Sequence, residues 1–315
     1  MVRSDATLLS MPAEFQQLEW DAELEDDLRQ LIRLAVREDL GRQNDWTTVA
    51  LVDSDRKGRA AVVARESGLI AGLRIIPVLI EEMRSVIQVD LMAADGEDVP
   101  AGAVLAELQG SARDLLTCER PLLNFVGRLS GIATLTQRFV RQLAGTQARI
   151  YDTRKTTPGW RRLEKYAVRI GGGRNHRTGL FDAILIKDKH LALASAQNLS
   201  LADAVRQARA FLSQAAKEGL TQSTVVEVEI DSLDVLDDVL AAGPDIVLLD
   251  NMSLDELRQA VARRDALSAQ IELEASGGVT LQSVRGIALT GIERISSGSL
   301  THAARSLDVA LDWRP

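Results

Sequence analysis

The chain has 315 residues, of which 46% are hydrophobic and 26% charged, an ordinary globular balance with enough length for a sizeable core. Its formal net charge of -8 argues against non-specific binding to nucleic acid or to an anionic membrane, so neither is expected as a partner. One cysteine and three histidines exclude an internal disulfide framework and zinc-site spacing. Together with an amino-terminal segment that lacks a signal-peptide core, they favour a reducing, cytoplasmic location.

The amino-terminal part predicts a mixed domain of helices and strands. Residues 1–20 are expected to form a loosely held arm. The segment 21–40 repeats apolar residues at helical spacing, and Gly41 after it is a typical C-cap. A strand-like segment, a helix and a second strand-like segment follow, at residues 58–73, 74–86 and 99–110.

A long helical region is predicted over residues 112–145, with an interruption near Pro121. Short β-rich runs then alternate with helical stretches: ARIYDT, FDAILIKD, TVVEVEID, DIVLLDN, IELEASGG and ERISSG. Repeated strand–helix alternation implies a parallel sheet, either closed as a barrel or open and doubly wound, and the even spacing favours a barrel. Neither GxGxxG nor GxxxxGK[ST] occurs, which argues against a Rossmann or P-loop fold.

The carboxyl ends of these strands carry polar and glycine residues, and barrel chemistry lies at such ends. The residues are Thr153, Arg154, Lys155, Lys187, Asp188, Glu229, Asp231, Asp250, Asn251, Ser276, Gly277, Gly278, Ser297 and Gly298. Any one of them could be an ordinary turn or helix cap, but six such ends together predict a site. The SGG and SSG turns offer backbone N–H groups at helix N-termini and are candidate phosphate sites.

The segment 153–177 contains eight arginines and lysines, His176, and a single acid, Glu164. Arginine binds planar carboxylates through two parallel hydrogen bonds, and Mg²⁺ shares oxygen ligands with phosphates. The strand-end residues are therefore interpreted as a site for a polyanion that carries phosphate, pyrophosphate and carboxylate groups.

Several long motifs, in order along the chain, resemble those of the quinolinate phosphoribosyltransferase family, also called nicotinate-nucleotide pyrophosphorylase (carboxylating). They are ERPLLNFVGRLSGIATLT, TRKTTPGWRRLEKYAV, GGGRNHRTGLFDAILIKD, EVEIDS, LLDNM, EASGGV and SSGSLTHA. The resemblance implies an α/β protein in which an N-terminal α/β sandwich domain precedes an incomplete, TIM-like α/β barrel. The corresponding boundaries are 1–119, with the C-terminal tail 303–315 packing against it, and 120–302. It also implies a homodimer with shared active sites, or a higher oligomer.

The implied reaction joins quinolinate and phosphoribosyl pyrophosphate to give nicotinate mononucleotide, pyrophosphate and CO₂ in de novo NAD biosynthesis. The family pattern assigns catalysis to Lys155, Lys187, Glu229 and Asp250. It assigns substrate binding to Arg120 from the partner subunit, Thr153, Arg154, His176, Arg177, Ser276, Gly277, Gly278, Ser297 and Gly298. Mg²⁺ would be held through pyrophosphate by Asp188, Glu229 and Asp250.

Other residues of the basic segment are expected to have no role in the site. Arg161, Arg162, Lys165 and Arg169 share a predicted helix and are interpreted as solvated or dimer-facing. The sequence departs from the family pattern at Trp160, where the family commonly has Leu, and at Lys189, where it has Asn. Two other functions stay open: a paralogous barrel phosphoribosyltransferase for another aromatic acid, and a non-catalytic barrel that binds a phosphorylated metabolite.

Overall fold

The computed structural model describes residues 14–194, 199–218, 224–267 and 270–314, which form two compact units. The parallel-sheet unit contains the described residues up to Gln16, residues 145–149 and residues 176–297. The antiparallel-sheet unit contains residues 17–144, 150–175 and those from Gly298 onward. In the described part of the chain, no helix has the length and apolar character needed to cross a membrane.

The antiparallel-sheet unit is built on a four-stranded sheet in the order β12-β1-β5-β3. Its strands are β12 (Val309–Arg314), β1 (Lys57–Ala64), β5 (Val104–Ser111) and β3 (Ile87–Leu91), and β2 (Gly68–Leu69) pairs separately with β4 (Asp98–Val99). The C-terminal residues therefore belong to this sheet, because β12 pairs with β1 from Arg59 opposite Arg314 to Ala64 opposite Val309.

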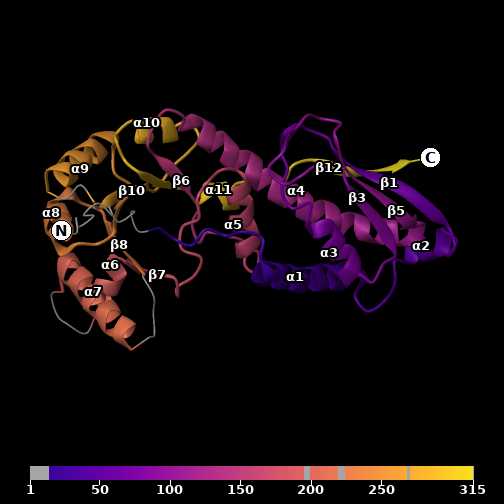
Figure 1. The fold of residues 1–315 in the computed structure, drawn as a ribbon, viewed down its shortest axis with the longest axis horizontal. Helices are drawn as coiled ribbons and strands as arrows, with labels where there is room; N and C mark the ends of the chain where they lie inside the picture. The colour runs from indigo at the N-terminus through magenta and orange to yellow at the C-terminus, as the bar shows by residue number, and fades with distance from the viewer. Residues whose placement is uncertain (1–13, 195–198, 219–223, 268–269, 315) are drawn as a thin grey trace, which may run out of the picture. The chain divides into compact units, whose positions relative to one another are not determined.

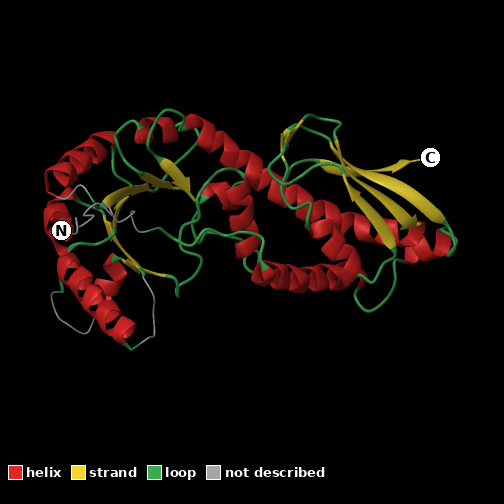
Figure 2. Cartoon of the chain, viewed as in Figure 1, coloured by secondary structure: helices red, strands yellow, loops and turns green. Residues whose placement is uncertain are grey.

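The helices of this unit are α1 (Ala22–Leu40), α2 (Trp46–Leu51), α3 (Ile75–Glu82), α4 (Ala112–Gln142), α5 (Arg161–Ile170) and α11 (Ser299–His302). The predicted first helix is confirmed as α1, which ends at Gly41 with a φ of 57°. Helix α4 contacts β1, β5 and β12 and lies along the sheet in Figure 2.

The predicted interruption near Pro121 is wrong, because α4 continues through this residue. Pro121 is itself buried, and apolar residues before and after it pack inward, so tertiary burial outweighs the missing backbone donor. The predicted domain boundary at Arg120 remains a prediction, while α4 runs past this position without a break and lies wholly in the antiparallel-sheet unit.

The expected loose arm is partly wrong, and its residues 1–13 lie outside the described part of the chain. Phe15 and Leu18 are only 4% and 3% exposed. The backbone N–H of Leu18 donates to Oδ1 of Asn175 at 2.8 Å. Burial of two apolar side chains and a specific hydrogen bond fix this segment.

The parallel sheet has its strands in the order β6-β11-β10-β9-β8-β7, and Arg149 is the residue of β6 that belongs to the parallel-sheet unit. The strands are β6 (Arg149–Tyr151), β7 (Ala183–Ile186), β8 (Val225–Ile230), β9 (Ile246–Asp250), β10 (Glu272–Ser276) and β11 (Arg294–Ser296). Strand β6 joins β11 through Arg149, whose N–H donates to the carbonyl of Glu293 at 2.9 Å. Read as a circle, this is the order of a barrel that stays open between β6 and β7, so the predicted fold class is confirmed.

Helices separate these strands along the chain, as the alternating pattern predicts. They are α6 (Asp188–Leu193), α7 (Leu201–Lys217), α8 (Leu236–Ala242, after the short 3₁₀ turn Leu233–Val235), α9 (Leu254–Leu267) and α10 (Val284–Ala288). In Figure 1 these helices lie outside the curved sheet. Strands β8, β9 and β10 are almost continuously buried, which is typical of parallel strands covered on both faces.

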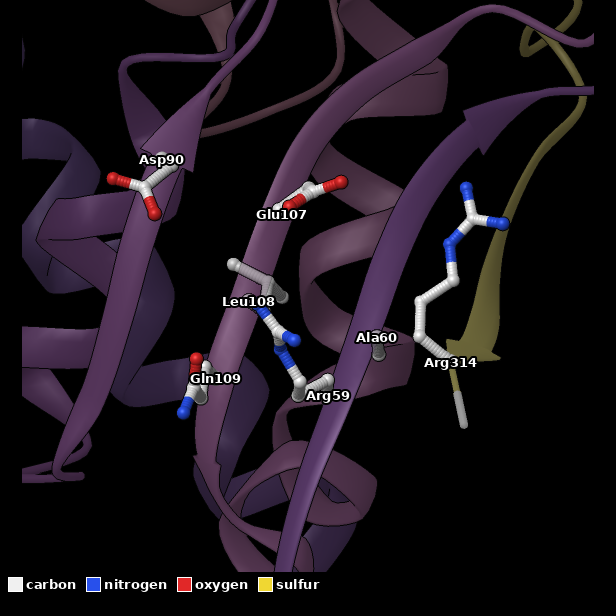
Figure 3. A pocket seen from close by; sticks show the side chains of 7 residues that line it. All are labelled: Arg59, Ala60, Asp90, Glu107, Leu108, Gln109 and Arg314. Atoms are coloured by element: carbon white, nitrogen blue, oxygen red, sulfur yellow. The ribbon is translucent and has the colours of Figure 1, made fainter.

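A hollow of about 200 Å³ lies on the antiparallel sheet (Figure 3). Its lining side chains come from β1, β3, β5 and β12: Arg59, Ala60, Asp90, Glu107, Leu108, Gln109 and Arg314. Both signs of charge are represented, and none of these seven residues is a predicted site residue.

Candidate active site

The carboxyl ends of the parallel strands place predicted site residues at one edge of the sheet. Pairing of β7 with β8 ends at Ile186 opposite Val228, so Lys187 and Glu229 come next in register. Their side chains form an ion pair and are 31% and 19% exposed. On the neighbouring strands Ser276 is directly opposite Asp250. The edge therefore presents a lysine, two carboxylates and a serine on successive strands.

The acid at the end of β9 is supported by its own turn. Nδ2 of Asn251 donates to Oδ2 of Asp250 at 2.9 Å, and Asn251 has a φ of 55°. Its backbone N–H donates to the carbonyl of Ser276 at 2.9 Å, which ties the β9 turn to the β10 turn. Asp188 is exposed at the start of α6, where the N–H of Lys187 donates to Nδ1 of His190 at 2.9 Å.

The turn after β10 requires glycine. Gly277 has a φ of 92°, and a Cβ there would lie 2.2 Å from Oδ1 of Asn251. Gly278 also has a positive φ, 59°. The hydroxyl of Ser296 donates to that of Ser276 at 3.1 Å, and the hydroxyl of Ser297 donates to the carbonyl of Val279 at 3.2 Å. The hydroxyls hold the turns, and backbone groups are left to approach an anion closely.

His176 lies in a buried cluster of charges, which we call the His176 cluster: His176, Glu227, Glu274 and Arg294. Its Nε2 is 3.0 Å from Oε2 of Glu227 and 3.5 Å from Oε1 of Glu274. Nδ1 accepts the N–H of Arg177 at 2.8 Å. The Phe15 ring stacks at 4.2 Å on the other side.

The two acids of the His176 cluster differ in their protonation. Burial and the Glu227 charge raise the pKa of Glu274, against the opposing effect of His176. Burial also acts to raise the pKa of Glu227, but the positive charges of His176, Arg294 and Arg177 outweigh it and lower that pKa. Arg294 is fully buried and pairs with Glu272 at 2.8 Å and Glu274 at 3.2 Å.

Histidine and the two acids of this cluster form the one group of three potential metal ligands within 4.8 Å of one another among the described residues. The guanidinium of Arg294 pairs with Glu274, so one of the two acids already has a cationic partner within the protein. The carboxylates predicted for Mg²⁺, Asp188, Glu229 and Asp250, do not form such a group in the described part of the chain.

The antiparallel-sheet unit holds the predicted residues after β6. The N–H of Lys155 donates to Oγ1 of Thr153 at 3.0 Å, which shapes the turn. Lys155 is exposed, whereas Nε of Arg154 is buried and has no hydrogen-bond partner among the residues described. A buried guanidinium donor without a partner is costly, and a carboxylate is a group that could accept its hydrogen bond.

Two further predicted residues belong to this unit. Gly298 begins α11, and a Cβ there would lie 2.8 Å from Cδ of Lys155 and 3.3 Å from Nε2 of His302. A side chain at this position would displace the side chains of Lys155 and His302. Arg120 lies on α4 with 65% of its side chain exposed and only a 3.9 Å approach to Glu119.

The interpretation of Lys165 as solvated or dimer-facing is wrong. This lysine is fully buried on α5 and forms an ion pair with the equally buried Asp152. Trp160, the departure from the family pattern, stacks on Phe125 of α4 at 4.6 Å and 17°. Glu227 and Glu274 were not predicted as site residues, although a charged residue inside a buried strand is a usable signal.

Family models and known proteins match almost the whole chain. The model for the quinolinate phosphoribosyl transferase N-terminal domain matches residues 45–130, and the model for its C-terminal domain matches residues 132–312. The nicotinate-nucleotide pyrophosphorylase [carboxylating] of Mycobacterium leprae is 43% identical over 289 residues, 91% of this chain and 97% of that protein. A probable enzyme of the same name from Bacillus subtilis is 41% identical over 90% of this chain and 93% of its own length.

Solved structures give the same result. The nicotinate-nucleotide pyrophosphorylase of Francisella tularensis has a TM-score of 0.82 and 36% identity, covering 92% of this chain and 97% of that one. The fold and the strand-end residues define a phosphoribosyltransferase of the α/β class. The chain belongs to the quinolinate phosphoribosyltransferase family.

Proposed function

We propose that this chain transfers the phosphoribosyl group of phosphoribosyl pyrophosphate to quinolinate with loss of CO₂. The products are nicotinate mononucleotide and pyrophosphate, in NAD biosynthesis. The family match and the relatives support this function over the two alternatives that the sequence left open. The observation that carries the proposal is the buried, unpaired Nε of Arg154 beside the exposed Lys155, a donor arrangement suited to an anionic substrate.

The roles follow from the charges. Arg154, His176 and Arg177 are proposed to bind the quinolinate carboxylates. Ser276, Gly277, Gly278, Ser297 and Gly298 are proposed for the 5-phosphate, with Thr153 shaping the turn that presents Lys155. Their support is the close backbone approach at Gly277 and Gly298 and the N–H groups of these turns.

The proposed reaction has two parts: pyrophosphate leaves the ribose carbon, and the pyridine ring that has bound this carbon then loses CO₂. As pyrophosphate leaves, Lys155 and Lys187 neutralise it, and positive charge develops on the ribose carbon. Glu229 and Asp250 stabilise that charge. The pyridine nitrogen attacks and becomes cationic. Its positive charge stabilises the electron pair left on C2 when the 2-carboxylate leaves as CO₂, and a proton from water then binds C2 to complete nicotinate mononucleotide. No covalent enzyme intermediate is needed.

We propose that Mg²⁺ binds together with phosphoribosyl pyrophosphate. Glu229 is neutralised by Lys187, and the three predicted carboxylates form no ligand group among the described residues, so they do not make a preformed metal site. Mg²⁺ prefers to keep several waters and to bind phosphates together with one or two carboxylates. We therefore place it on the pyrophosphate, within reach of Asp188, Glu229 and Asp250, and assign it no separate step.

A homodimer with shared sites, or a higher oligomer, is part of the proposal, as is a cytoplasmic location. Arg120 supports sharing, because it is largely exposed and only loosely paired. If it acts in the partner's site, Arg120→Ala and Lys155→Ala proteins are each nearly inactive. After thorough subunit exchange, half the dimers are mixed and hold one intact site of two, so activity returns to about a quarter of the unmutated level. Exchanged mixtures that stay inactive would place Arg120 in its own subunit's site or give it a structural role.

The function itself is tested by turnover of purified protein with each acid. Nicotinate mononucleotide should form from quinolinate and phosphoribosyl pyrophosphate, with CO₂ released in equal amount. Nicotinate lacks the 2-carboxylate and should not be used, because losing a buried charge-assisted contact costs roughly 2–5 kcal/mol. Equal turnover of both acids would overturn the assignment.

A further inference from the structure

The loop that carries Arg154 and Lys155 is held at its start by a buried polar network, which we call the Lys165 network: Asp152, Lys165 and Asn175. Asp152 is the residue immediately before the loop, and its carboxylate pairs with Lys165 on α5. Nδ2 of Asn175 donates to the other oxygen of Asp152 at 2.7 Å and to the carbonyl of Lys165 at 2.9 Å. All three residues are fully buried.

Asn175 has its remaining polar groups fixed as well. Its Oδ1 accepts the N–H of Leu18 at 2.8 Å. Its backbone N–H donates to the side chain of Gln17 at 2.8 Å, and its carbonyl accepts from that side chain at 3.0 Å. An amide with every donor and acceptor used has one orientation, and it precedes His176 and Arg177 in the chain.

The loop is also held at its middle and its end. The hydroxyl of Thr301 donates to the carbonyl of Lys155 at 2.8 Å. The buried carboxylate of Glu164 accepts from the N–H of Thr157 at 3.1 Å and from its hydroxyl at 2.9 Å, and it pairs with Arg128 at 2.7 Å. The backbone from 152 to 157 is thereby anchored at three points.

A buried ion pair is weak evidence for stability, because apolar residues of similar volume often serve as well or better. The Asp152–Lys165 pair contributes to orientation here, because both residues are also hydrogen-bonded to Asn175 and Asp152 leads directly into the loop. We propose that Lys165 and Asn175, acting through Asp152, are positioning residues that hold Arg154 in its binding geometry, while the hydrogen bond from Thr301 holds Lys155. The proposal rests on the function proposed above and adds residues that do not touch substrate.

The test variant is Asn175→Ala, which leaves the charges of Lys165 and Asp152 paired. The matched control is Tyr166→Phe. Tyr166 lies on α5 next to Lys165, and this change removes its single 2.7 Å hydrogen bond to Asp95. KM for quinolinate should rise at least about tenfold in Asn175→Ala while kcat at saturation stays within about threefold, because positioning is lost and the reacting groups are kept. The control should keep both constants within about twofold.

A second variant guards against misfolding. Asp152→Asn combined with Lys165→Met removes both charges together and leaves no buried charge unpaired. Assays are run well below each protein's Tm. Raised quinolinate KM in both variants supports the proposal. Unchanged KM in folded variants of an active protein overturns it, as does an equal rise in Tyr166→Phe. An unmutated protein that forms no nicotinate mononucleotide instead rejects the proposed function, and the inference with it.

Discussion

The two buried charge clusters, one in each unit, are built by different rules. In the Lys165 network, no buried side-chain oxygen or nitrogen lacks a hydrogen-bond partner. In the His176 cluster, both oxygens of Glu227 and Oε1 of Glu274 lack one. Nε2 of His176 nevertheless approaches Oε2 of Glu227 to 3.0 Å.

We interpret this difference as a difference in role: the Lys165 network positions backbone, whereas the His176 cluster lies beside groups that bind or react. A fully satisfied network has one arrangement and holds the backbone that leads from it. Unsatisfied buried carboxylates cost about 1–3 kcal/mol each and are found where a structure stores strain or binds something. Glu227, the member of the His176 cluster on β8, is two residues from Glu229 and on the same face of that strand.

The largest expected effect concerns Glu229. Glu229→Gln should lower kcat on the order of 100-fold, because the carboxylate stabilises charge that develops only in the transition state. Quinolinate KM should stay the same or fall, since an acid repels the anionic substrates. Its pair with Lys187 is partly exposed, so thermal unfolding should change by about 1 kcal/mol or less. Normal kcat with weakened quinolinate binding would contradict this role. The control variant is Asp231→Asn, at an exposed position of the same turn.

Unequal effects on stability should distinguish the two acids of the His176 cluster. Glu227→Gln removes a charge that compensates His176 and Arg294, and should cost about 3–5 kcal/mol of unfolding free energy. Glu274→Gln should cost about 1 kcal/mol or less at low pH, since it resembles the protonated acid that burial favours.

The pH dependence of Glu274→Gln follows from the sign of the shift. The pKa of Glu274 is raised in the folded state, so its contribution to stability is greatest below the ordinary value and is lost as pH rises through the folded pKa. Glutamine cannot lose that proton. The Tm of Glu274→Gln minus that of the unmutated protein should therefore increase with pH. A difference that is constant between pH 5 and 8, measured by calorimetry, would show that Glu274 does not titrate in this way.

Periodic signals explain how much of the fold could be predicted. Apolar spacing located α1 and α3, and alternation of short buried strands with helices gave the parallel sheet. The strand-end rule also placed Lys187 and Glu229 side by side, because parallel strands in register end at one edge. The helix break predicted at Pro121 from local propensity was wrong, because buried residues on both sides of Pro121 keep α4 continuous.

The Lys165 network could not be predicted in this way. A lysine on an amphipathic helix is normally solvated, and its partner Asp152 lies 13 residues away at the end of a strand. Asn175 is 23 residues from Asp152, so only tertiary folding brings the three together. Glu227 was missed for a related reason: EVEI reads as a strand with alternating polar positions, and both glutamates point to the same covered face.

The most direct test of this separation is kcat at saturating substrates for Asn175→Ala and Glu229→Gln, measured side by side. The account predicts that Asn175→Ala keeps kcat within about threefold of the unmutated protein, while Glu229→Gln loses it on the order of 100-fold. If kcat falls equally in both folded variants, the Lys165 network does more than position the binding loop, and the separation of positioning residues from catalytic residues fails.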